Sequence, residues 1–114
     1  MGSAMRNAYT AVIARGELWQ GSVQTEPYEA AWAGEAVFFV RVLEAKGSGE
    51  AIAKVQISPD GMHWVDEGGA LSIHAEAGHL SFQRVANFGG WLRLSVVVPP
   101  SIGITVVATL ALKA

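Results

Sequence analysis

Residues 51–67, AIAKVQISPDGMHWVDE, place a strand, a turn and a second strand in direct succession, and this segment most constrains the fold. In its first half every second residue is apolar: Ala53, Val55 and Ile57. The Pro-Asp-Gly sequence at 59–61 then breaks the alternation, because proline presets φ for a turn and glycine accepts a positive φ. We therefore expect a β-hairpin, with Trp64 covering its inner face and His63 pointing outward.

The same period of two recurs along most of the chain. The clearest long strands are expected at 36–44, 91–98 and 102–113, and shorter ones at 9–14, 70–75 and 79–85. Turns are expected at 67–69 and 76–78, and a bulge near 83–84 that would restore the register of its strand. Residues 17–24 have mixed parity and are interpreted as an edge strand or a long loop anchored by Trp19.

Turn signals about every ten residues, without a convincing helix, predict an all-β fold. We expect an antiparallel β-sandwich of seven to nine strands, most economically a jelly roll. The length of 114 residues suits one domain, which we place at 6–114. Residues 1–5, Met-Gly-Ser-Ala-Met, are interpreted as a cloning remnant, and we find no signal peptide. The sequence leaves the cellular location open.

Composition narrows the choice of partners. Hydrophobic residues make up 51% and charged residues 16%, against about 25% charged in an average soluble domain, so some apolar surface is expected to meet a partner. The net charge of −2 and the lack of like-charge runs argue against nucleic acid. The longest apolar stretches are about half of the roughly 20 residues that span a membrane, so no insertion is expected. With no cysteine, thiol chemistry and disulfides are excluded.

The polar residues do not form a recognised catalytic or metal pattern. Three histidines lie near carboxylates without metal-ligand spacing and are interpreted as surface residues beside turns: His63, His74 and His79. Serine, histidine and acid co-occur without a G-x-S-x-G nucleophile elbow, and the glutamates of 26–35 are interpreted as an acidic loop. We therefore predict no catalytic residue, no metal site, no cofactor and no enzymatic activity.

Aromatic residues offer a different chemistry. Exposed aromatic rings stack on sugars and anchor protein interfaces, although core packing is the ordinary role of a tryptophan. Trp91 has the opposite parity from Leu92 and is expected on an outer face. The candidate ligand-stacking residues are Trp91, Trp32 and Tyr28, with Glu26, Asn87 or Gln83 as partners for sugar hydroxyls.

Several strands carry bulky apolar groups on both faces. A single subunit cannot easily bury all of these groups. If one parity faces the core, the other forms a second apolar surface that self-association would cover. The residues predicted to form this self-association face are Val37, Phe39, Leu43, Val97, Val107 and Thr109.

Residues 58–64, Ser-Pro-Asp-Gly-Met-His-Trp, resemble the S-x-D-G-x-x-W hairpin of galactose-binding-like jelly rolls of the discoidin type and of small β-sandwich proteins of phage particles. Residues 88–96 are similar to the later aromatic-x-R-hydrophobic strand of those folds. The resemblance implies the fold, and either glycan binding or a structural role. It carries over no binding residue, because the chain is shorter than a discoidin domain and lacks its cysteines and ligand-loop pattern.

We accordingly predict a non-enzymatic, self-assembling structural β-sandwich subunit, a homo-oligomer that forms a coat-like particle or a filament. The alternative is a carbohydrate-binding module that uses exposed tryptophans, with a glycan as its partner.

Overall fold

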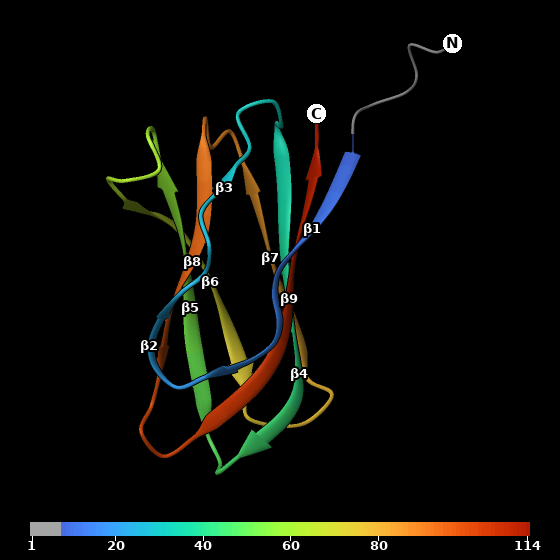
Figure 1. Cartoon of the computed structure of the whole chain (residues 1–114), viewed down its shortest axis with the longest axis vertical. Coiled ribbons are helices and arrows are strands. Elements are labelled where there is room, and N and C mark those ends of the chain that lie inside the picture. Colours follow the sequence, from blue (N-terminus) through green and yellow to red (C-terminus); the bar gives the residue numbers. More distant parts are fainter. Residues whose placement is uncertain (1–7) are drawn as a thin grey trace.

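The computed structural model describes residues 8–114 and places them in two facing antiparallel sheets (Figure 1). No helix occurs in this part of the chain. The nine strands are β1 (Ala8–Trp19), β2 (Gly21–Gln24), β3 (Tyr28–Glu29), β4 (Glu35–Lys46), β5 (Glu50–Ser58), β6 (Val65–His74), β7 (Leu80–Ala86), β8 (Trp91–Val98) and β9 (Gly103–Lys113). The interpretation of residues 1–5 as a cloning remnant lies outside the described residues.

The strand order is that of a jelly roll. Sheet A has the order β1-β9-β4-β7, and sheet B has the order β2-β8-β5-β6, with the short β3 also paired to β8. Because β2 and β3 share one position beside β8, eight strand positions result, arranged as the two Greek keys of a jelly roll. The predicted antiparallel β-sandwich is confirmed, with nine strands.

The core lies between the sheets and is built by the strand parities that the sequence predicted. On β8 the side chains of Leu92, Leu94, Val96 and Val98 are buried, and on β9 every second residue from Ile104 to Leu112 is buried. β4 contributes Phe38, Val40 and Val42 from the facing positions of sheet A. This continuous apolar interior is the main stabilising contribution available to the fold.

The first strand is longer than expected, because it continues through two register shifts, after Val12 and after Arg15, and the chain changes sheets only at Gln20. Trp19 ends β1 fully buried and donates a 3.2 Å hydrogen bond from Nε1 to Glu17, while Gly21 begins β2 in sheet B with φ of +67°. The mixed parity of 17–24 therefore arises from the end of one strand and the start of another, and not from a single edge strand or loop.

Three local predictions were wrong. Residues 67–69 lie inside β6, at the register shift opposite Lys54 and Gln56, instead of forming a separate turn. The pairing of β7 with β4 contains no bulge near 83–84, because Leu80 and Phe82 face outward while Val85 faces the core. Trp64 is half-buried outside the core, where the Arg93 guanidinium carbon lies 4.2 Å from the centroid of its ring.

Candidate functional site

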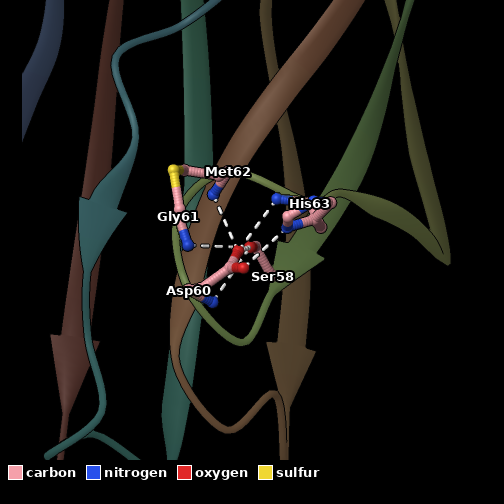
Figure 2. Close-up of polar contacts among 5 residues, drawn as sticks. All are labelled: Ser58, Asp60, Gly61, Met62 and His63. Atoms are coloured by element: carbon pink, nitrogen blue, oxygen red, sulfur yellow. Dashed lines mark hydrogen bonds and ion pairs between the residues drawn. The ribbon is translucent and has the colours of Figure 1, made fainter.

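The β5–β6 turn is a rigid structural unit held by one carboxylate (Figure 2). Asp60 Oδ1 accepts hydrogen bonds from the amides of Met62 at 2.8 Å and His63 at 2.9 Å, and Asp60 Oδ2 lies 2.7 Å from His63 Nδ1. Hydrogen bonds to His63, first its amide and then its side chain, hold the pKa of Asp60 well below its usual range, and the Met62 amide adds to this. The S-x-D-G sequence is therefore explained by turn geometry.

Ser58 and His63 do not share a hydrogen bond in this turn. The Ser58 hydroxyl donates to Asp60 Oδ1 at 3.0 Å and accepts from the amides of Asp60 and Gly61, at 3.2 and 2.8 Å. The serine is itself buried, whereas the side chain of His63 is 83% exposed. The contacts of Ser58 cap the turn.

The same turn packs on Trp91. Gly61 has φ of +80°, and a Cβ built there would lie 3.1 Å from Cδ2 of the Trp91 ring. Trp91 does point to the outer side of β8, opposite in parity to the buried Leu92, but the turn lies against its ring and leaves it only half-exposed. This contact reduces the ring area that a ligand could stack on.

The outer face of sheet B is mostly polar and its side chains bond to one another. Arg93 Nε donates to Gln56 at 2.8 Å, and Gln56 Nε2 donates to Asp66 at 3.0 Å. Lys54 lies 3.9 Å from the other oxygen of Asp66. Partial burial lowers the pKa of Arg93, whose guanidinium also covers Trp64.

The outer face of sheet A is different, because one row across its four strands consists of three apolar residues and a threonine. The pairings place Val12 of β1, Thr109 of β9, Phe39 of β4 and Phe82 of β7 side by side. The rings of Phe39 and Phe82 are 6.3 Å apart at their centroids. Two flanking rows complete the surface: Thr10, Ala111, Val37 and Arg84 on one side, and Arg15, Val107, Arg41 and Leu80 on the other.

We call these twelve residues the sheet A face. No element of residues 8–114 covers it, and Phe82 and Leu80 on the edge strand are 50% and 59% exposed. A cavity of about 380 Å³ lies at one end of this face, lined in part by Val37, Arg84 and Lys113. The guanidinium carbon of Arg84 also lies 4.9 Å from the centroid of the Phe82 ring, so the arginines frame the apolar centre.

The structure divides the six residues of the predicted self-association face. Val37, Phe39, Val107 and Thr109 all belong to the sheet A face. Val97 lies on the opposite side of the molecule, on the outer face of sheet B, where it is 62% exposed. Leu43 lies at the register shift in β4 between Val42 and Glu44. Sequence reasoning missed Val12, Leu80 and Phe82, since only the strand order places them beside Phe39.

Two of the three predicted stacking residues lie together, and Trp91 does not join them. Tyr28 and Trp32 line one pocket of about 380 Å³ with Ala8 and Tyr9, at the open edge between β1 and β3. Glu26 is exposed in the segment before β3, and the amide of Asn87 bonds to Gly34 O. Gln83 lies on β7, at the far edge of the sandwich, and bonds to Arg84 O.

The remaining histidines form a pair at the β6–β7 connection. The rings of His74 and His79 meet edge to face with centroids 4.6 Å apart, and His74 Nδ1 lies 3.7 Å from Glu50. Within residues 8–114, no group of three or more histidine, cysteine or carboxylate side chains is arranged to hold a metal ion. No helix in that part of the chain is long and apolar enough to cross a membrane.

The fold and its surfaces define a jelly-roll β-sandwich in which an apolar cluster lies at the centre of the sheet A face. No protein-family model and no curated protein sequence matches this chain. Among solved structures it is similar to the SPBc2 prophage-derived protein YomS, with a TM-score of 0.63 and 11% identity over 96% of each chain.

Two further structures share the architecture. One belongs to the Bacillus endospore appendages, which form a family of disulfide-linked pili (TM-score 0.54, 9% identity, 96% of this chain and 90% of the other). The other is the CBM36-1 domain of a multidomain xylanase from the hindgut metagenome of Trinervitermes trinervoides (TM-score 0.56, 11% identity, 92% and 96%). At this level of identity the likeness shows the fold, and the predicted resemblance to phage-derived and carbohydrate-binding β-sandwiches is confirmed at that level.

Proposed function

We propose that this protein is a structural subunit that associates with copies of itself through the sheet A face. The observation that carries the proposal is the row of Val12, Thr109, Phe39 and Phe82, which continues across every strand of one sheet. Contiguous exposed apolar surface of this kind marks interaction sites, whereas scattered apolar residues do not.

The contrast between the two sheets supports this proposal. On sheet B the charged and amide side chains satisfy one another, as in the Arg93–Gln56–Asp66 chain, so little is gained by burying them. On sheet A the centre is aromatic and aliphatic. Burying this apolar surface in an interface would stabilise the assembly by about 25 cal/mol for each Å² removed from water.

A second copy of the chain is the occupant that we favour. The sheet A face crosses four strands, an extent that a self-complementary interface about a two-fold axis can use. Its border carries both signs of charge, with Arg41 on β4 near Glu44 of the same strand, so two copies can meet with opposite charges. The similar fold of a pilus protein supports the compatibility of this architecture with assembly. In this proposal the subunit has no enzymatic role.

Charge introduced on one sheet or the other tests the proposal. Phe82→Asp and Phe39→Asp place a carboxylate in the row of the sheet A face, and we expect each to shift the sedimentation coefficient toward that of the monomer. Val97→Asp is the matched control, since Val97 is similarly exposed (62% against 50% for Phe82) but lies on sheet B. Association lost in Val97→Asp and retained in both phenylalanine variants would reject this face.

A further inference from the structure

Three large aromatic residues gather at one open edge of the sandwich, and none of them belongs to the sheet A face. Tyr9 lies near the start of β1, Tyr28 in β3, and Trp32 in the turn that follows. With Ala8 they line a shallow, open pocket of about 380 Å³. β3 lies toward the same end of the molecule as the C-terminus, at the top of Figure 1.

The rings are held in place and still exposed. Tyr9 and Tyr28 stack with centroids 6.4 Å apart and planes inclined by 21°. Glu29 accepts a 2.8 Å hydrogen bond from the amide of Ala31, and Ala33 bonds back to Ala30 O at 3.0 Å, which fixes the turn that carries Trp32. Even so, Tyr9 remains 55% and Trp32 43% exposed.

The polar groups of the pocket favour an uncharged, hydroxyl-rich ligand. The phenol oxygens of Tyr9 and Tyr28 can each donate and accept a hydrogen bond. Burial raises the pKa of Tyr28, and interactions with Tyr9 and Glu29 raise it further, so this phenol keeps its proton. Glu29 lies beside Tyr28 within β3 and Glu26 lies just before β3, whereas Lys113, paired with Ala8, belongs to the outer side of sheet A. The negative charge of Glu29 acts on Tyr28 and disfavours an anionic ligand.

We propose that Tyr9, Tyr28 and Trp32 bind one ring of a neutral saccharide. The aromatic faces would pack against the C–H face of a pyranose, and the two phenols would bond its hydroxyl groups. The site is independent of the self-association face, because it lies at the β1–β3 edge between the sheets and shares none of the twelve residues that define that face. An assembly built through sheet A would thus carry one saccharide site on each subunit.

The test uses the full chain and a panel of neutral oligosaccharides: cellohexaose, xylohexaose, maltohexaose and chitohexaose, each titrated by isothermal calorimetry. We expect at least one to bind, and we expect Trp32→Ala and Tyr9→Ala each to weaken that binding by about tenfold, as loss of an aromatic contact does. Val97→Ala is the matched control, since this apolar residue is also exposed (62%) but lies on the outer face of sheet B, outside both proposed surfaces. It should leave saccharide affinity unchanged.

Two results would overturn the proposal. The first is no heat of binding with any member of the panel. The second is binding that Trp32→Ala and Tyr9→Ala leave intact while both variants lower the thermal midpoint, which would make the aromatic cluster a purely structural closure of the sandwich edge. Tyr28→Phe separates the hydroxyl from the ring, and we expect it to weaken saccharide binding without changing the thermal midpoint by more than the control does.

Discussion

At the scale of single residues, Asp60 holds the β5–β6 turn together. Its carboxylate joins both ends of the β5–β6 turn through two amides, one hydroxyl and one imidazole. The sequence was sufficient to predict this turn, because proline, aspartate and glycine each favour a turn for a different physical reason. The sequence was not sufficient to place Trp64. This side chain lies outside the core in a cation–π contact with Arg93, which comes from a strand distant in sequence.

The depressed pKa of Asp60 predicts a specific pH dependence of stability. Because the folded state favours the ionised carboxylate, its contribution is fully present above the usual pKa near 3.8 and is lost as the pH falls below that value toward the lower folded pKa. Asp60→Asn removes the charge at every pH. We expect urea midpoints of the variant to lie below those of the parent at pH 6 and to converge with them between pH 4 and pH 2. A constant difference across that range would contradict the assignment.

At the scale of elements, the change of sheet between β1 and β2 was the feature that sequence reasoning could least resolve. A period of two reports which residues share a face only while the chain stays in one sheet. At Gln20 the parity is reset, and the bulges in β1 after Val12 and Arg15 shift it twice more. In β8 and β9, which have no such interruption, the predicted inner and outer faces agree with the structure at every position.

This crossing predicts an ordered pair of stability losses. Trp19→Ala empties a fully buried site at the end of β1, and we expect it to reduce the free energy of unfolding by about 3–5 kcal/mol. Gly21→Ala meets no neighbouring atom within 4 Å but must hold φ at +67°, so a smaller loss of about 1 kcal/mol is expected. Chemical denaturation of both variants checks the order, which the reverse ranking would contradict.

The candidate site could be predicted in part. The strand order explains which of its residues were predicted and which were missed. Val37, Phe39, Val107 and Thr109 were identified from parity within two long strands, which happen to be neighbours in sheet A. Val97 has the same parity signal but lies on the other sheet, and no local pattern distinguishes the two. Tyr9 was missed as a partner of Tyr28 because the contact joins an edge of sheet A to an edge of sheet B.

At the scale of the whole molecule, the two sheets differ in how the side chains of their outer faces are arranged. On the outer face of sheet B, charged and amide side chains form hydrogen bonds with one another. The centre of the sheet A face instead carries an apolar row with arginines beside it. The placement of 6–114 in a single domain stays a prediction. An interface on sheet A would bury apolar side chains for which the small interior of a 12.0 kDa subunit has no room.

The apolar character of that face predicts how salt affects assembly. Sodium chloride at about 0.5 M screens exposed charges, with a Debye length of only a few Å, but leaves apolar burial intact. Sodium sulfate strengthens such burial. We expect the association constant to change little in sodium chloride and to rise in sulfate, as followed by sedimentation equilibrium. Dissociation in sodium chloride would point instead to an interface held by ion pairs.

The most direct measurement is the solution mass of the unaltered chain, by light scattering coupled to size exclusion over a range of loading concentrations. We expect a mass that is a multiple of 12.0 kDa, with the monomer appearing only on dilution or in the Phe82→Asp variant. A mass of 12.0 kDa at every concentration, including the highest, would contradict the claim that the sheet A face joins copies of this protein.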